Sequence, residues 1–182
     1  MKLIPLSQNN KCNNSNLNLF ALVDDEDFDF LNQFNWYAFK NRKQNKTYYA
    51  GRQQRQITGK FKSISMHREI MGCTIGDGKI IDHKDGNGLN CQRINMRFAI
   101  HSQNMANRGT YGKSKYLGVH IQIVVNKYKD KTYPPTKTIV ASITANKKTK
   151  YLGSFKSEEE AALAYNKAAL KYHGEFARLN TI

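Results

Sequence analysis

The chain reads Ile81-Asp82-His83-Lys84-Asp85-Gly86-Asn87 where a predicted strand runs into a tight turn. Asp-Gly is a strong turn signal, so a second strand over residues 93–98 can return beside the first. A helix is expected to follow, from residue 99 or 100 to about 107. Because side chains alternate along a strand, we expect that Asp82 and His83 do not both lie in a core. This segment therefore predicts a hairpin that leads into a helix.

Polar side chains on these elements can converge on one site. The four candidates are Asp82, His83, Asn95 and Asn104, and His101 shares a helix face with Asn104. An aspartate carboxylate and an asparagine carbonyl are hard oxygen ligands, suited to Mg²⁺ or Mn²⁺ with several waters retained. A neutral histidine can take a proton from an attacking water, and a neighbouring amide can fix which imidazole nitrogen carries hydrogen. Together these groups predict phosphodiester hydrolysis around one divalent cation.

The charge of the chain favours a polyanionic partner. The 182 residues carry a formal net charge of +15, and residues 40–68 hold nine basic residues and no acid. Phosphate contacts by such a surface make binding fall steeply with salt. An anionic membrane is the competing partner, but the sequence has no basic amphipathic helix and no apolar run of about 18 residues. We therefore expect a nucleic acid partner, and neither export nor membrane insertion.

The cysteines predict a reducing, intracellular compartment. Cys12, Cys73 and Cys91 form no CxxC pair and cannot all pair internally. We interpret them as small buried hydrophobic residues, with no disulfide framework and no structural zinc.

The residues around the predicted hairpin resemble the HNH endonuclease family. The resemblance is carried by residues 66–72, 81–87, 95–97 and 101–104, with a further likeness at 21–27 and 36–38 to the segment that precedes the domain. It is closest to the homing-type branch of phages and introns, whose ββα-metal fold hydrolyses DNA. Phage origin would place the protein in the cytoplasm of a bacterial host.

This resemblance implies a role for each residue that matches the motif. His83 corresponds to the general base and Asp82 to the first metal ligand. Asn95 corresponds to the residue that orients the base, and Asn104 to the second ligand, which the helix contributes. Some members carry a histidine at the helical position, so His101 remains an alternative ligand.

The last third of the chain resembles the AP2/ERF DNA-binding domain. Residues 116–125, 136–144 and 150–155 predict three strands, and Ser157 with Glu160 forms a capping box for a helix that Gly174 ends. The family places such a sheet in the major groove, with the helix behind it. The common arginine and tryptophan readers are replaced by His120, Gln122, Ile139 and Ser142, and the first hairpin loop is enlarged around 128–135. The resemblance therefore implies DNA binding, but not the family's plant-type target.

The predicted fold class is α+β in four parts. They are a strand-rich, DNA-contacting segment over 1–60, the ββα-metal nuclease core over 61–108, a linker over 109–114, and an AP2-like sheet packed on one helix over 115–182. Within the first part we expect strands at 19–23, 36–39 and 47–50, and a short helix near 28–31.

Basic and polar side chains on both halves are the predicted contacts to double-stranded DNA. They are Lys40, Arg42, Lys43, Arg52, Arg55, His67, Arg68, Arg97, Arg108, Lys115, His120, Gln122, Lys137, Ser142, Thr144, Lys148, Lys150 and Tyr151. No protein partner is implied, so we expect a monomer.

Two other functions use the same features. A non-catalytic DNA-binding regulator would keep the nuclease fold as a scaffold, but the complete set of Asp82, His83, Asn95 and Asn104 argues against it. An RNA-processing nuclease fits the charge, yet a sheet built for the major groove does not suit A-form RNA.

Overall fold

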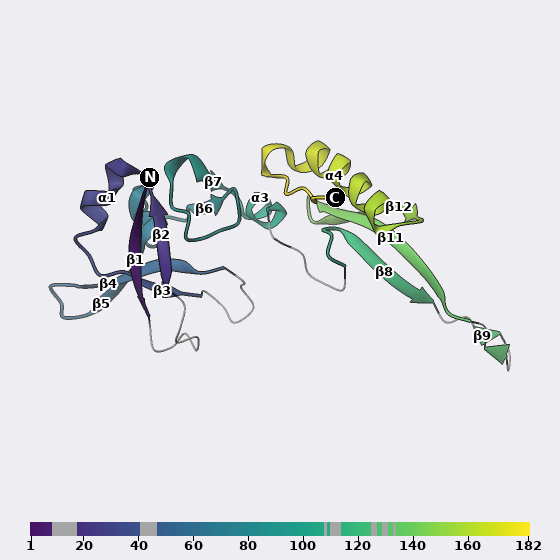
Figure 1. Cartoon of the computed structure of the whole chain (residues 1–182), viewed down its shortest axis with the longest axis horizontal. Helices are drawn as coiled ribbons and strands as arrows, with labels where there is room; N and C mark the ends of the chain where they lie inside the picture. Colours follow the sequence, from purple (N-terminus) through teal and green to yellow (C-terminus); the bar gives the residue numbers. More distant parts are fainter. Residues whose placement is uncertain are drawn as a thin grey trace. The chain divides into compact units, whose positions relative to one another are not determined.

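The computed structural model describes residues 1–8, 18–40, 47–107, 109, 114–124, 127–128, 131–132 and 134–182. They form two compact units, Met1–Ile100 and His101–Ile182. Both units combine helices with largely antiparallel strands, which confirms the predicted α+β class (Figure 1). None of the helices in the described ranges has the length and apolar character needed to cross a membrane.

A five-stranded sheet with the order β2-β1-β3-β4-β5 organises the first unit. Its strands are β1 (Lys2–Gln8), β2 (Leu19–Val23), β3 (Tyr37–Phe39), β4 (Tyr49–Arg55) and β5 (Phe61–Ser65). The three expected strands are present, whereas β1 and β5 were not predicted. Proline is unusual inside a sheet, and Pro5 is tolerated in β1 because the neighbouring strand β3 pairs only with Ser7 and Gln8.

The predicted hairpin is also present in this unit. Strand β6 (Ile80–His83) pairs antiparallel with β7 (Met96–Ala99), and one turn of 3₁₀ helix, η1 (Arg93–Asn95), starts the return. Helices α1 (Asp25–Leu31) and α2 (Met66–Ile70) complete the unit, and α1 corresponds to the helix expected near 28–31.

One hydrophobic core joins the sheet to the hairpin. Trp36 and Met66 are 1% and 0% exposed and lie in the same cluster, and the Trp36 indole donates to the Leu31 carbonyl at 2.8 Å. Leu89 and Cys91, from the loop between β6 and η1, are buried in it as well. The core thus crosses the boundary predicted at residue 60, and residues 1–60 do not form a compact unit of their own.

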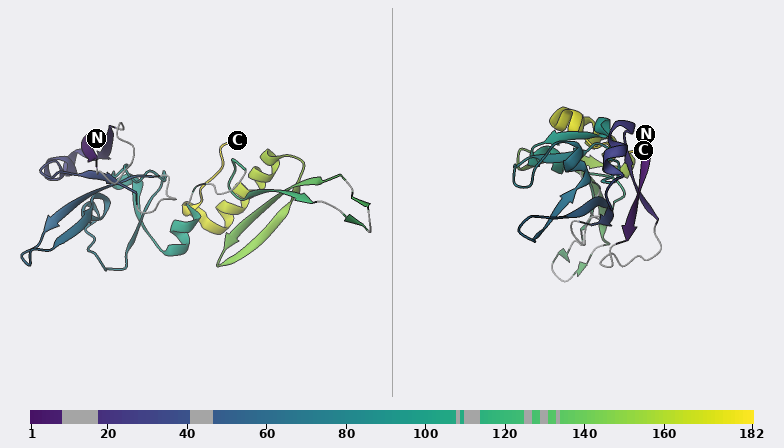
Figure 2. Two further views of the ribbon diagram at one scale, coloured as in Figure 1. Left: turned by 90° about the horizontal axis from the view of Figure 1, so that it is seen from below. Right: turned by 90° about the vertical axis from the view of Figure 1, so that its left-hand side faces the viewer.

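A three-stranded antiparallel sheet, ordered β12-β11-β8, forms the second unit. Its strands are β8 (Val119–Val124), β11 (Thr136–Ala145) and β12 (Lys148–Phe155), and helix α4 (Glu158–His173) lies along one face (Figures 1 and 2). Ser157 Oγ accepts from the Glu160 amide at 3.1 Å, which confirms the capping box. The contact between helix and sheet is made by fully buried alanines, namely Ala141, Ala161 and Ala162. Because these side chains are small, the helix lies close to the sheet.

Two further features of this unit differ from the prediction, and a third part of the prediction lies outside the described residues. The enlarged hairpin after β8 has a short ladder of its own, β9 (Lys127–Tyr128) with β10 (Lys131–Thr132). Helix α3 (His101–Ala106) groups with the second unit, next to the 3₁₀ turn η2 (Gly174–Phe176), although it was predicted as part of the nuclease core. Most of the predicted linker, including 110–113, lies outside the described residues.

An ion pair inside the first unit links the sheet to α2. Arg52 on β4 is only 7% exposed, and its guanidinium binds both carboxylate oxygens of Glu69, at 3.1 and 2.6 Å. The same guanidinium lies 4.0 Å from the centre of the Phe34 ring. Arg52 was predicted to contact DNA, but its burial and its pairing with Glu69 make it a structural residue.

Replacement of Glu69 by alanine should destabilise the first unit by about 3–5 kcal/mol, because it leaves the Arg52 charge buried and uncompensated. Asp29→Ala is the control, since its pair with Lys2 is 4.0 Å long and Asp29 is 90% exposed. That variant should lose at most about 1 kcal/mol. Urea unfolding followed by tryptophan fluorescence measures both, and equal losses would contradict the structural role of Arg52.

Candidate active site

The β6–β7 hairpin carries the two residues with the clearest predicted roles. Asp82 and His83 are 3% and 6% exposed, so both are buried, contrary to the expectation from strand alternation. The two side chains are covered from opposite sides. Asp82 lies across the ladder from Arg97, whose Nε and Nη2 donate to its Oδ2 at 2.9 and 2.8 Å, while His83 packs against other rings.

The imidazole of His83 is part of a cluster of three rings. Its centroid lies 5.3 Å from that of His67 and 5.9 Å from that of Tyr49, both in edge-on contacts. His67 and Tyr49 also meet each other, at 5.6 Å. The rings come from α2, β4 and β6, so the surroundings of His83 exist only after the sheet, the helix and the hairpin have assembled.

Burial keeps the imidazoles of this cluster neutral. It lowers the pKa of His83 below its ordinary value, against the opposing charges of Asp85 and Asp82. Burial likewise lowers the pKa of His67 to about 3, with smaller contributions from His83 and Arg68. At neutral pH His83 is therefore in the form that accepts a proton, as a general base requires.

Asn95 anchors the turn that follows His83. Its Nδ2 donates to Asp85 Oδ1 at 3.0 Å and to the Asn90 carbonyl at 2.8 Å, and its Oδ1 accepts from the Asp85 amide at 3.2 Å. Its backbone carbonyl accepts from the Lys84 amide at 2.9 Å. Both amide hydrogens are thus engaged in the loop, so the Asn95 side chain is bonded to the turn that follows His83 and not to the imidazole.

The loop over residues 84–92 is docked on β2. The Leu22 amide donates to the Leu89 carbonyl and the Cys91 amide donates to the Leu22 carbonyl, both at 2.8 Å. Burial, with a smaller effect of Asp85, raises the pKa of Cys91 to about 12, which keeps the thiol protonated. Cys91 is therefore the small buried residue expected from the sequence; Cys73 is half-buried, and Cys12 lies outside the described residues.

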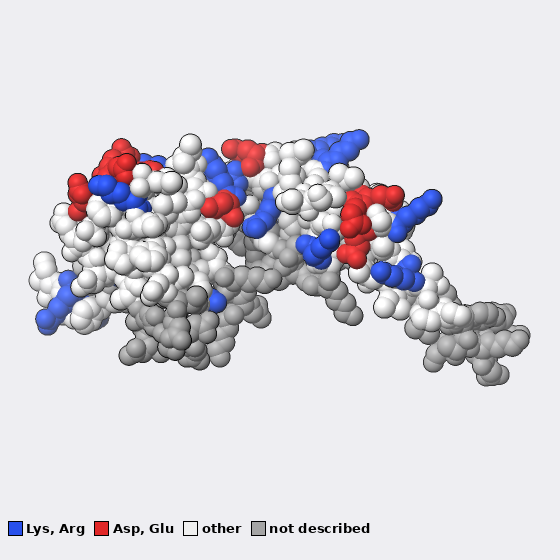
Figure 3. Space-filling model, in the orientation of Figure 1, with Lys and Arg blue, Asp and Glu red and all other residues white. Residues whose placement is uncertain are grey.

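The acidic run before and within α1 holds the far end of the same loop. Figure 3 shows acidic side chains gathered over α1. Asp24 accepts from the Arg93 amide at 2.8 Å and from Gln92 Nε2 at 3.0 Å, and the Arg93 guanidinium pairs with Asp27 at 2.6 Å and with Glu26 at 2.8 Å. These acids favour the helix N-terminus and also fix the start of η1, a second role that their sequence did not reveal.

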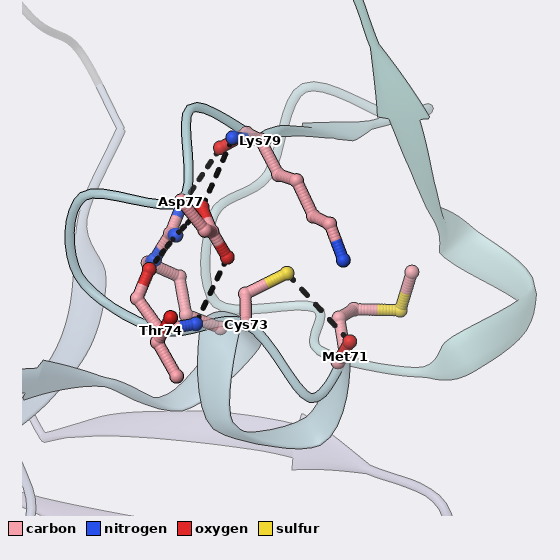
Figure 4. A network of polar contacts seen from close by, with 6 residues as sticks. Met71, Cys73, Thr74, Asp77 and Lys79 are labelled. Atoms are coloured by element: carbon pink, nitrogen blue, oxygen red, sulfur yellow. Dashed lines mark hydrogen bonds and ion pairs between the residues drawn. The ribbon is translucent and has the colours of Figure 1, made fainter.

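A polar network orders the chain that leads into β6 (Figure 4). The Asp77 carboxylate accepts from the Thr74 and Lys79 amides at 2.9 and 3.0 Å. Arg68 donates to Asp77 at 2.6 Å and to the Lys79 carbonyl at 2.9 Å. The Arg68 guanidinium is thus bonded within this loop, and its predicted contact to DNA stays a prediction.

The other predicted contacts in the first unit have varied surroundings. Arg97 is committed to Asp82. Lys40 and Arg55 are both exposed, and the Lys40 ammonium lies 4.4 Å from the Tyr48 ring centre. The predicted contacts Arg42, Lys43 and Arg108 lie outside the described residues.

The helical ligands belong to the second unit. His101 is exposed and Asn104 half-buried on α3. Their place in a metal site with Asp82 therefore stays a prediction. Among the described residues, no three His, Cys, Asp or Glu side chains are grouped so as to hold a metal ion.

The face of the second sheet that points away from α4 gathers five of the predicted DNA contacts. They are His120, Gln122, Ser142, Thr144 and Tyr151, which alternate with the core positions Ile139, Ala141 and Ile143. His120 Nε2 lies 3.0 Å from Ser142 Oγ, and Tyr151 Oη lies 2.7 Å from Ser154 Oγ. Hydroxyl, amide and imidazole groups thus form this face, with no charged side chain among the five.

The predicted lysines of this unit lie elsewhere. Lys137, Lys148 and Lys150 occupy the alternate register, in line with the core positions, and all three are exposed. The Lys150 ammonium lies 4.2 Å from the Tyr172 ring of α4, and the Lys115 ammonium lies 3.9 Å from Glu159 Oε1. The basic residues among the predicted DNA contacts therefore occupy different register positions on the sheet from the neutral ones.

Several residues that shape the site had no predicted role in it. Tyr49 carries no motif signal, and Asp24 was assigned only to a helix start. Asp85 was identified as a turn residue, and its carboxylate also accepts from Asn90 and Asn95 within the loop. Gly88 joins distant parts of the chain. The Gly88 amide donates to Thr47 Oγ1 at 2.9 Å, and a Cβ at Gly88 would lie 2.5 Å from Tyr49 Cε1.

The hairpin, its buried Asp-His pair and its asparagine-anchored turn are the distinctive features of the first unit, and comparison with known proteins shows the family of the chain. An HNH endonuclease of Acanthamoeba polyphaga mimivirus, itself uncharacterized, is 32% identical over 168 residues, which span 90% of this chain and 75% of the viral protein. The chain therefore belongs to the HNH endonuclease family. No protein-family model matches it, and no solved structure matches it.

Replacement of Gly88 by alanine should displace the loop that carries the site. The added Cβ would lie 2.6 Å from the Tyr48 carbonyl oxygen, which is backbone and cannot rotate away. We expect a loss of about 1–3 kcal/mol in unfolding free energy, as for other overpacked sites. Gly109→Ala is the matched control, because nothing lies within 4 Å of its Cβ position. Equal stability of the two variants in thermal unfolding would contradict this packing.

Proposed function

We propose that this protein is a homing-type, metal-dependent DNA endonuclease that its second unit targets to DNA. The observation that carries the proposal is the buried Asp82–His83 pair, in which His83 is neutral and the following turn is locked by Asn95. Membership of the HNH endonuclease family supports the reaction class. The net charge of +15 supports a phosphodiester polyanion as the substrate.

His83 has the form required for activating water. Its imidazole accepts a proton as a water oxygen attacks phosphorus, and the bond from phosphorus to the 3′ oxygen breaks. The products are a 5′ phosphate and a 3′ hydroxyl. Asn95 contributes by holding the turn after His83, so that the ring does not need to reorganise during the reaction.

The cation that the family implies fits the residues of the chain. Asp82 offers a buried carboxylate whose Oδ2 is already oriented by Arg97, and Asn104 or His101 is the proposed partner from α3. A hydrated Mg²⁺ or Mn²⁺ needs only one or two protein ligands. When bound, such a cation polarises the scissile phosphate and stabilises the departing 3′ oxygen. Zinc suits this oxygen-rich set less well.

The neutral face of the second sheet is the proposed target-reading surface of a monomer bound to double-stranded DNA. Hydroxyl, amide and imidazole groups exchange hydrogen bonds with base edges, and the exposed lysines in the alternate register are suited to phosphates. The AP2/ERF resemblance rests on the sequence motifs and on the observed order of strands and helix. A tethered reader raises the effective concentration of the nuclease at its site.

Loss of the base tests the nuclease. His83→Ala should lower the cleavage rate at least about a hundredfold, the lower limit for removal of a general base, while DNA binding remains. Supercoiled plasmid with Mg²⁺ or Mn²⁺ measures nicking and linearisation, and a mobility shift in the presence of EDTA measures binding. His173→Ala, in the second unit, is the matched histidine control. Cleavage by His83→Ala at the control rate would remove His83 from this role.

The same assay distinguishes the nuclease from the non-catalytic regulator. If the wild-type protein binds DNA tightly and with strong salt dependence but cleaves no DNA with either cation, the non-catalytic regulator is the correct function.

Changes on the sheet face test target reading. In a His83→Ala background, the full-length protein selects its preferred site from a random duplex pool. Gln122→Ala should then lose about 1–3 kcal/mol of preference for that site over random DNA, the usual cost of one base contact. Lys150→Ala is the control, because its ammonium lies against Tyr172 of α4 and not on the reading face, so it should leave this preference unchanged. Unchanged preference in Gln122→Ala, measured by competition binding, would contradict the proposed reading face.

A further inference from the structure

Two rings beside the proposed general base, those of Tyr49 and His67, have no role in the proposed reaction. We propose that Tyr49 and His67 are positioning residues that hold the His83 imidazole in its reactive orientation through ring contacts. This inference rests on the proposed nuclease function. It adds to that function two residues from β4 and α2, outside the hairpin that carries His83.

The geometry restricts the His83 ring from two sides. The His67 ring meets it at 77° and the Tyr49 ring at 62°, with centroids 5.3 and 5.9 Å away. A rotation of the imidazole about its side-chain bonds would drive it into one ring or the other. The backbone behind it is fixed as well, because the His83 carbonyl accepts from the Gly86 amide at 2.9 Å.

The Tyr49 and His67 rings are themselves held in place. The Tyr49 ring packs on the Phe39 ring at 6.0 Å and lies against the backbone of Gly88. His67 sits between Met66, which is 0% exposed, and Arg68, which Asp77 anchors. A ring can position its neighbour only if it is less free than that neighbour, and these contacts meet this condition.

His67 contributes a ring and not a proton. Its Nδ1 is buried, and among the described residues it has no hydrogen-bond partner. An imidazole that stays neutral in such a site is a poor acid, because its one remaining N–H is only very weakly acidic, and the low pKa of His67 keeps it in this form at neutral pH. A proton relay from His67 to His83 would need a hydrogen bond, whereas an edge-on contact needs only the shape of the ring.

Paired substitutions distinguish shape from chemistry. His67→Phe and Tyr49→Phe keep a ring, and each should keep kcat within about threefold of the wild type. His67→Leu and Tyr49→Leu remove it and should lower kcat about 10- to 100-fold, the size expected from about 1 Å of misplacement, with KM nearly unchanged. Single-turnover cleavage of a defined duplex by the full-length protein measures both constants, and thermal unfolding confirms that each variant is folded.

Each outcome either supports or overturns the positioning role of Tyr49 and His67. Slow leucine variants with rescue by phenylalanine support positioning by the rings, because general structural damage would not be repaired in kcat alone. Folded leucine variants that cleave at the wild-type rate would overturn the inference while the nuclease stands. A His67→Phe variant as slow as His67→Leu would overturn it too, since the nitrogen would then matter. If the wild-type protein cleaves no DNA, both the nuclease and this inference fail.

Discussion

Everything at the candidate active site depends on the insertion of the loop between β6 and η1 into the core of the first unit. Leu89 and Cys91 are buried there, and the two backbone hydrogen bonds to Leu22 hold the loop on β2. Hydrophobic burial supplies the stabilisation, and the backbone bonds supply the register. Because of this docking, a short hairpin that would be marginal alone becomes a rigid support for Asp82 and His83.

The arginines show how a basic sequence can overstate the charge offered to DNA. Arg52, Arg68 and Arg97 were all predicted to contact DNA, and each pairs with a carboxylate of its own unit, namely Glu69, Asp77 and Asp82. Planar guanidinium groups suit such fixed, multidentate pairing better than ammonium groups do. The exposed positive charge of the described residues consists more of lysine, whose flexible ammonium suits phosphates as a point charge.

The two units were predictable to different degrees. The second unit is built from local signals, since β11 and α4 have their alternation and capping box written in consecutive residues. In the first unit the sheet places β1 between β2 and β3, and the rings around His83 come from β4 and α2. Such long-range contacts leave no periodic pattern in the sequence. For this reason β1 and β5 were not predicted, and Tyr49 was given no role in the site.

The sequence by itself determined the α+β class, the hairpin at β6 and β7, the capped helix α4, and the identity of Asp82, His83 and Asn95 as the chemically distinctive residues. These follow from turn propensity, alternation and the chemistry of single side chains. Only the tertiary structure decided that Asp82 and His83 are both buried, that the Asn95 side chain is bonded within the turn, and that one core crosses residue 60. Burial is a property of what packs over a side chain, and that covering comes from segments far away in the sequence.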